Sequence, residues 1–117
     1  MKYHGGCHCG GIAFELEADA ITEAIDCNCS MCRKRGGLLA FFPRAALTLT
    51  TPESALGTYT FNRNQIRHHF CPGCGVAPFS EGVDPRTGMA TAAVNVRCLP
   101  DVDLAALSVK PVDGASF

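Results

Sequence analysis

Cys71-Pro72-Gly73-Cys74-Gly75 is the stretch of this sequence that decides the fold. Its Cys-x-x-Cys spacing allows two thiolates to reach one tetrahedral metal ion, and the glycines permit the tight turn around that ion. A structural zinc site normally has four protein ligands, so this stretch supplies half of a site and two more cysteines must fold back to it. The other closely spaced cysteines of the chain are Cys7, Cys9, Cys27, Cys29 and Cys32.

The number of cysteines favours one division of the ligands. The first predicted site is a closed one, built by Cys7, Cys9, Cys71 and Cys74. A separate group of three is then left, namely Cys27, Cys29 and Cys32. Structural zinc sites are closed by four protein ligands, whereas catalytic zinc keeps three and leaves a fourth position for water or substrate. The spacing therefore predicts two zinc ions per chain, one structural and one catalytic.

The group of three lies in the sequence Cys27-Asn28-Cys29-Ser30-Met31-Cys32. Zinc held by three thiolates has a formal charge of about −1, so it acidifies bound water less than a three-histidine site and suits a soft thiol substrate better. The basic residues Arg33, Lys34 and Arg35 follow directly and could bind substrate carboxylates. The alternative for this basic run is a solvated turn, because charged residues beside loops usually face water.

Composition and the N-terminal residues exclude several classes of protein. Residues 1–11 contain no apolar segment of a signal peptide, so we expect a reducing, cytoplasmic location in which clustered thiols bind metal rather than form disulfides. No apolar run reaches the ~18–20 residues that a membrane span requires. The net charge is −1, without a long basic segment. We therefore expect a small thiol as the partner, with no nucleic acid and no membrane.

The pattern of apolar residues predicts one all-β domain over residues 1–117. Ile12, Phe14 and Leu16 alternate with Ala or Glu, which is the period-2 pattern of a half-buried strand. Further strands are predicted over residues 22–26, 38–42, 47–50, 59–62, 65–70, 76–80 and 89–96, with a hairpin turn near residues 62–64 and a short helix over residues 101–107, capped by Asp101. The predicted core comprises Ile12, Phe14, Leu16, Ile25, Leu39, Phe41, Leu47, Leu49, Phe61, Phe79, Ala92, Val94, Val96 and Leu107.

Cys98 and the histidines lie outside these groups. A single thiol at the end of an apolar strand is more often a small buried hydrophobe than a nucleophile, so Cys98 is a secondary candidate. His4 and His8 flank the first cysteine pair and could compete as zinc ligands. His68 and His69 share one predicted strand and must point to opposite faces, so one of them could face the open site. A surface or hydrogen-bonded histidine is the more frequent alternative.

Three motifs, in this order, resemble the glutathione-dependent formaldehyde-activating enzyme family, which includes centromere protein V. They are Gly6-Cys7-His8-Cys9-Gly10, Cys27-Asn28-Cys29-Ser30-Met31-Cys32-Arg33-Lys34 and Phe70-Cys71-Pro72-Gly73-Cys74-Gly75. The resemblance extends to Val94-Asn95-Val96 and so covers nearly the whole chain. It implies a zinc-bound, twisted-sheet β-tent fold similar to that of methionine sulfoxide reductase type B, with the division of zinc ligands given above.

The resemblance also implies an activity. The expected reaction is that of a carbon–sulfur lyase of the S-hydroxymethylglutathione synthase type, in which glutathione adds reversibly to formaldehyde. Cys27, Cys29 and Cys32 would then be the catalytic residues. Two alternatives stay open: a non-catalytic zinc module that binds a thiol or a protein partner, and a redox enzyme that uses Cys98. Against the redox enzyme, Pro100 stands where those reductases usually have Asn. The sequence also allows a homodimer.

Overall fold

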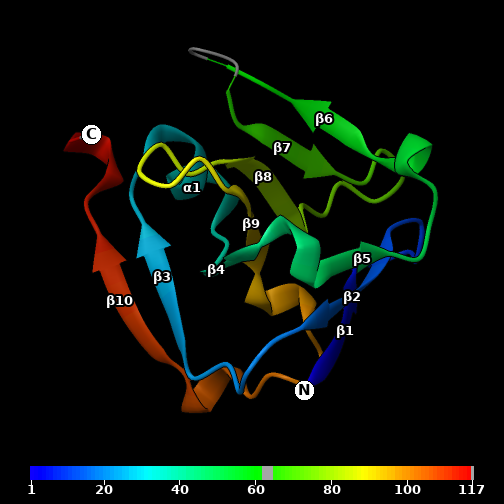
Figure 1. Ribbon diagram of the computed structural model, residues 1–117, viewed down its shortest axis with the longest axis horizontal. Coiled ribbons are helices and arrows are strands. Elements are labelled where there is room, and N and C mark those ends of the chain that lie inside the picture. The colour runs from blue at the N-terminus through cyan, green and yellow to red at the C-terminus, as the bar shows by residue number, and fades with distance from the viewer. Residues whose placement is uncertain (62–64, 117) are drawn as a thin grey trace.

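The computed structural model describes residues 1–61 and 65–116, whose regular secondary structure is mainly β-strand (Figure 1). The strands are β1 (Lys2–Gly6), β2 (Ala13–Glu17), β3 (Glu23–Cys27), β4 (Leu39–Pro43), β5 (Leu47–Leu49), β6 (Gly57–Tyr59), β7 (Arg67–Phe70), β8 (Phe79–Val83), β9 (Ala90–Asn95) and β10 (Ser108–Val112). The α-helix of the described chain is α1 (Ser30–Arg35). The prediction of a mainly β fold is confirmed, and the likeness to methionine sulfoxide reductase type B stays a prediction. None of the helices in this described part has the length and apolar character needed to cross a membrane.

The strands form two sheets. The small sheet is antiparallel, with the order β1-β2-β5, and the large sheet has the order β10-β3-β4-β9-β8-β7-β6. In the large sheet β10 pairs with β3 in parallel, while the other strand pairs are antiparallel. Figure 1 shows the small sheet at the lower right, with β10 and β3 on the opposite side of the molecule. The chain therefore encloses its core between the small sheet and one face of the large sheet.

The core is built from side chains at alternate positions of facing strands. On β2, Phe14 and Leu16 are buried, which confirms the period-2 pattern read from the sequence. On β9 the buried positions are Ala92 and Val94. The rings of Phe14 and Phe79 meet edge to face, with their centroids 5.7 Å apart and an angle of 64° between the ring planes. This aromatic pair joins the small sheet to the large one.

Most of the predicted core residues are buried, namely Ile12, Phe14, Leu16, Leu47, Phe79, Ala92, Val94 and Val96. Others are half-buried, namely Ile25, Leu39, Leu49, Phe61 and Leu107. The prediction is wrong for Phe41, whose side chain is 56% exposed. On β4, Ala40 and Phe42 pack against the core, so the alternation of side chains turns Phe41 to the other face of the large sheet. The apolar run over residues 38–42 thus belongs to a strand with one covered face.

Several elements differ from the predictions. β1 and β10 were not predicted as strands, because β1 contains two glycines and β10 contains Pro111, which an edge strand tolerates. Instead of a helix over residues 101–107, a 3₁₀ turn spans Leu104–Ala106, and Asp103 rather than Asp101 caps it. β8 begins later than the strand predicted over residues 76–80, because the carbonyl of Val76 accepts a hydrogen bond from the turn after β7.

The predicted hairpin lies partly outside the described residues. β6 and β7 pair in antiparallel register, with Gly57 opposite Phe70 and Tyr59 opposite His68. The strand predicted over residues 59–62 therefore lies earlier in the chain, at Gly57–Tyr59. The predicted end of that strand and its turn near residues 62–64 lie outside the part of the chain that the structure describes.

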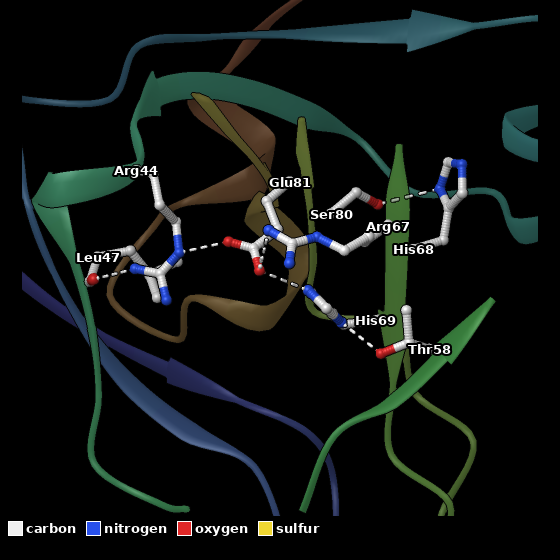
Figure 2. Close-up of polar contacts among 8 residues, drawn as sticks. All are labelled: Arg44, Leu47, Thr58, Arg67, His68, His69, Ser80 and Glu81. Atoms are coloured by element: carbon white, nitrogen blue, oxygen red, sulfur yellow. Dashed lines mark hydrogen bonds and ion pairs between the residues drawn. The ribbon is translucent and has the colours of Figure 1, made fainter. Parts of the chain in front are cut away.

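A network of charged and polar side chains around Glu81 connects four strands and the turn before β5 (Figure 2). The guanidinium of Arg44 donates to the Glu81 carboxylate from its Nε and to the carbonyl of Leu47 from its Nη1. On the other side, Nε2 of His69 lies 2.9 Å from Glu81 Oε1, and Nη2 of Arg67 lies 3.2 Å from the same oxygen. His69 is 4% exposed. Because Leu47 begins β5 and Glu81 lies on β8, the network ties the two sheets together.

The pKa of Glu81 reflects this environment. Burial alone would raise the pKa, but the hydrogen bonds from His69 and Arg44 and the charges of Arg44 and Arg67 hold it below its usual value. The carboxylate is therefore ionised near neutral pH and contributes stability only in that form. This contribution is complete above the unfolded-state pKa of about 4.3 and is lost as the pH falls through the lower folded-state value.

We expect Glu81→Gln to lower the free energy of unfolding by about 3 kcal/mol at pH 7, because it leaves the half-buried guanidinium of Arg44 and the buried ring of His69 without their carboxylate partner. The difference from the wild type should stay constant down to about pH 5 and narrow below about pH 4.3. Urea unfolding of the metal-loaded protein across this range measures it. Glu17→Gln is the control, since Glu17 forms an exposed pair with the N-terminus and should change stability by less than about 1 kcal/mol. Equal losses in the two variants would contradict the role given to Glu81.

Candidate metal centres

The first cysteine cluster lies where the end of β1 meets the end of β7. Its members are Cys7, Cys9, Cys71 and Cys74. The turn after β7 is closed by two backbone hydrogen bonds, from the N–H of Cys71 to the carbonyl of Val76 at 2.9 Å and from the N–H of Gly75 to the carbonyl of Cys71 at 2.7 Å. Gly75 has a φ of +82°, a backbone conformation that favours glycine. The Cys-x-x-Cys-Gly stretch thus forms the tight turn that its sequence predicts.

The spacing of the sulfurs fits a tetrahedral zinc ion. All four Sγ atoms lie within 4.8 Å of one another. The Sγ atoms of Cys7 and Cys9 are 3.8 Å apart, and those of Cys9 and Cys71 are 3.5 Å apart. Zinc with four bonds of about 2.3 Å places its sulfurs about 3.8 Å from one another. The cluster therefore has both the donor type and the spacing of a closed structural zinc site.

The four thiols differ in their protonation. Hydrogen bonds from the backbone N–H groups of Val76 and Cys9 lower the pKa of Cys74 to about 6. The N–H of Gly11 lowers the pKa of Cys9, but the neighbouring sulfurs, with Cys71 first among them, outweigh it and raise that pKa to about 11. Without a cation, Cys74 forms a thiolate easily while Cys9 keeps its proton, because like charges disfavour one another. Such a cluster favours a divalent cation that neutralises several thiolates at once.

The second cysteine cluster comprises Cys27, Cys29 and Cys32. Cys27 ends β3, Cys29 is the N-cap of α1, and Cys32 lies in the first turn of the helix. The N–H of Cys29 donates to Cys27 Sγ, and the N–H of Cys32 donates to Cys29 Sγ, both at 3.4 Å. The three Sγ atoms lie within 4.8 Å of one another, and within the described residues no His, Asp or Glu joins them. Three sulfurs fit a zinc ion that keeps a fourth position open.

The start of α1 favours the thiolate form of Cys29. Burial alone would raise the pKa of Cys29, but the N–H of Cys32 and the neighbouring thiols lower it below its usual value. Burial and the neighbouring sulfurs of Cys29 and Cys27 raise the pKa of Cys32 to about 12. Cys29 therefore forms a thiolate more easily than Cys32, whose proton a bound cation would have to replace.

The C-terminal residues cover one side of the second cluster. The side chain of Asn28 donates from Nδ2 to Asp113 Oδ1 at 3.0 Å, and its Oδ1 accepts from the N–H of Ala115 at 3.0 Å. Between these contacts lies Gly114, where an added Cβ would stand 2.5 Å from the Sγ of Cys27. Only glycine fits this close approach. The sequence did not single out these residues, because the parallel pairing of β10 with β3, a long-range feature, brings them to the cluster.

The basic residues Arg33, Lys34 and Arg35 form the last turn of α1 and are exposed, so a solvated turn and a binding role are both compatible with their positions. Of these residues, Arg35 senses the charge of the second cluster. Burial lowers the pKa of Arg35, whereas the charge of Cys32 raises it. A cationic side chain beside a cluster of thiolates favours their ionised form.

The two neighbouring histidines of β7 point to opposite faces, as their adjacent positions predict (Figure 2). His69 is the buried member of the Glu81 network. The ring of His68 is stacked on Phe61, with centroids 5.3 Å apart, and its Nδ1 lies 3.1 Å from Ser80 Oγ. Burial lowers the pKa of His68, and the positive charge of Arg35 lowers it further. His68 therefore lies on the same face of the large sheet as Ser80, opposite to the face that holds His69.

Cys98 and the N-terminal histidines take no part in either cluster. Burial raises the pKa of Cys98 to about 11, and the negative charges of Cys7 and Cys74 raise it as well. A thiol with this pKa is a poor nucleophile at neutral pH. His4 lies 3.6 Å from Glu15 and not among the sulfurs, and His8 is not part of the first cluster either.

Comparison with known proteins covers nearly the whole chain. A sequence profile described as glutathione-dependent formaldehyde-activating enzyme matches residues 2–111, a span that includes both cysteine clusters. The crystal structure of a Rhodobacter sphaeroides protein, a Northeast Structural Genomics target, is 30% identical and superposes with a TM-score of 0.78. That comparison covers 95% of this chain and 98% of the other.

We expect Gly114→Ala to weaken metal binding at the second cluster by about tenfold or more, because the added methyl group displaces Cys27 Sγ from its place. Competition with a chromophoric chelator measures the affinity of each site. Ala115→Ser is the control, since Ala115 contributes only a backbone N–H to the contact with Asn28. If Gly114→Ala bound metal as tightly as the control, the C-terminal residues would have no part in shaping the second cluster.

Proposed function

The chain belongs to the glutathione-dependent formaldehyde-activating enzyme family, and from this premise we propose that it is a zinc-dependent carbon–sulfur lyase. The proposed reaction is the reversible addition of the glutathione thiol to formaldehyde, which yields S-hydroxymethylglutathione. One observation carries the proposal: the seven clustered sulfurs divide into a set of four and a set of three. A set of four suits a structural ion, and a set of three leaves room for a substrate sulfur.

Each part of the second cluster has a role in this proposal. Zinc on Cys27, Cys29 and Cys32 would leave one position for the substrate thiolate and would lower the pKa of that thiol. The backbone N–H groups at the start of α1 hold the sulfurs of Cys27 and Cys29 in place and favour the ionised form of Cys29. Gly114 lies directly against Cys27, so the C-terminal residues cover one side of the cluster. The substrate thiol then approaches from the other side.

The basic turn of α1 supports glutathione as the thiol. Arg33, Lys34 and Arg35 follow Cys32 within one turn and are exposed. Glutathione carries two carboxylates, which arginine can bind in bidentate fashion and lysine as a point charge. The positive charges also offset the net negative charge of three thiolates and a divalent ion. A cytoplasmic location and a homodimer remain predictions made from the sequence.

The alternatives differ in what the second cluster does. A non-catalytic module would bind a thiol or a protein partner at the same sulfurs without turnover, and the measurements below separate it from a lyase. A redox enzyme based on Cys98 is disfavoured, because burial keeps this thiol protonated near neutral pH. The lyase is therefore the function that we propose.

Metal content tests the division of the sulfurs. We expect two zinc ions per chain in protein purified without oxygen, one in folded Cys29→Ser, and an unfolded chain for Cys74→Ser, because a structural zinc ion contributes on the order of 10 kcal/mol to folding. Native mass spectrometry counts the ions, and circular dichroism reports the fold. Cys98→Ser should keep both ions. A wild type with a single zinc ion would overturn the proposal of a second centre.

Turnover tests the reaction. Exchange NMR on equilibrated glutathione and formaldehyde should show that the zinc-loaded protein accelerates interconversion with the hydroxymethyl adduct beyond the spontaneous rate. Cys29→Ser should abolish the acceleration, whereas Cys98→Ser should leave it unchanged. No acceleration by a wild type that holds two zinc ions would exclude the formaldehyde lyase and favour the binding module.

A further inference from the structure

One row of side chains crosses the large sheet on the face turned away from the core, which we call the outer face. Going from β4 to β6, the row consists of Phe41, Ala93, Ser80, His68 and Tyr59. Residues directly opposite each other on neighbouring strands point to the same face. The side chain of Phe41, which was expected in the core, is 56% exposed here. The outer face therefore carries exposed apolar side chains that take no part in the core.

The middle of this row is hollowed into a groove of about 730 Å³. Its floor and walls are largely apolar and include Phe41, Ile66, Val83, Pro85 and Ala93. A volume of this size lies within the range of roughly 300–1,000 Å³ that is usual for sites that bind small organic molecules. The groove is thus large enough for a substrate group of many atoms.

The charged groups that border the groove already have partners. Arg86 Nε lies 3.6 Å from Asp84 Oδ1, and the N–H of Arg86 donates to the same oxygen at 2.9 Å. Glu81 is held by Arg44, Arg67 and His69 on the core side. Among the described residues that line the groove, the guanidinium of Arg86 is thus paired with Asp84, and the lining suits an uncharged, apolar group.

The groove and the second cysteine cluster lie on the same face of the large sheet. Ser80 lines the groove, and its Oγ lies 3.1 Å from Nδ1 of His68. Through the register of β3 with β4, Ile25 lies opposite Leu39, which shares the outer face with Phe41. Cys27, two positions after Ile25, therefore belongs to the outer face as well.

We propose that this groove binds the apolar part of an aldehyde larger than formaldehyde, so that the protein acts on the glutathione adduct of an aromatic or aliphatic aldehyde. This inference rests on the proposed lyase function and names its carbonyl substrate. Formaldehyde has a single carbon and gains nothing from an apolar groove. A hydrocarbon group in the groove would place its carbonyl carbon at the Ser80–His68 end, which the strand register makes the end nearer to the second cluster.

The chemistry is the same addition as with formaldehyde. The substrate sulfur forms a bond to the carbonyl carbon, and the π electrons of the C=O bond move to the oxygen. That oxygen takes up one proton while the thiol gives up one, so the step needs no oxidant or reductant. The hydroxyl of Ser80 and the ring of His68 are the polar groups at this end of the groove that can hydrogen-bond to the oxygen.

Binding is tested with benzyl alcohol, an unreactive probe that carries the ring but no carbonyl. Titration of the zinc-loaded protein, followed by amide NMR, should shift the signals of Gly82, Thr91 and Ala93. Ala93→Leu fills the middle of the groove and should weaken binding about fivefold or more. Ala90→Leu, on the same strand and outside the groove, is the control and should bind like the wild type. Val83→Ser is a second variant, at an exposed position where folding is not at risk.

Several results would overturn the proposal. One is a set of shifted amides outside the groove, and another is equal binding by the wild type and Ala93→Leu. A third is a sedimentation coefficient that falls toward that of a monomer in Ala93→Leu but not in Ala90→Leu. That result would make the groove an interface between copies of the chain.

Turnover separates this proposal from the lyase function itself. With glutathione and benzaldehyde, Ala93→Leu should lose about tenfold of the acceleration seen in exchange NMR, while its acceleration with formaldehyde stays at the wild-type level. An equal loss with both aldehydes would overturn the groove as a substrate site. If the wild type accelerated neither reaction, the lyase function and the aldehyde named here would both fail, and benzyl alcohol binding would still show whether the groove takes an apolar ligand.

Discussion

The meeting of the sulfurs of Cys9 and Cys71, 62 positions apart in the chain and 3.5 Å apart in space, is the constraint on which the rest of the structure depends. Cys9 follows β1 of the small sheet and Cys71 follows β7 of the large one, so the first cluster joins the two sheets at one end. The Glu81 network joins them again through Arg44. A chain of this size buries only a limited apolar core, so the first cluster and the Glu81 network contribute to holding the two sheets together.

The cysteine clusters could be predicted from the sequence because their geometry is local. Two cysteines separated by one or two residues reach a common ion whatever the rest of the fold does. The number of thiols then favoured one pairing of the segments, and the structure brings together the same two sets of sulfurs. The strand at Ala13–Glu17 was equally visible, because every second side chain of it enters the core. In both cases the signal lies within a few consecutive residues.

The features that the sequence did not reveal depend on distant pairings. Gly114 touches Cys27 only because β10 adds to the edge of the large sheet beside β3. Strand propensities do not predict β10, because it contains Pro111. Glu81 and His69 look like ordinary polar residues until the register of β7 and β8 brings them together. Phe41 belongs to an apolar run that looks fully buried in the sequence. Its side chain is exposed because β4 packs on the core with one face only.

The cysteine clusters and the groove are specified by different parts of the sequence. The cysteines lie at strand ends and in the turns that follow, whereas the groove is lined by outward positions of β4, β8 and β9. On β9, Ala92 and Val94 point into the core while Thr91 and Ala93 point outward, so a change at an outward position leaves no cavity in the core. A chain can therefore keep the fold and both sets of sulfurs while its outer face changes. This independence explains why membership of the family identifies the scaffold more firmly than it identifies the carbonyl substrate.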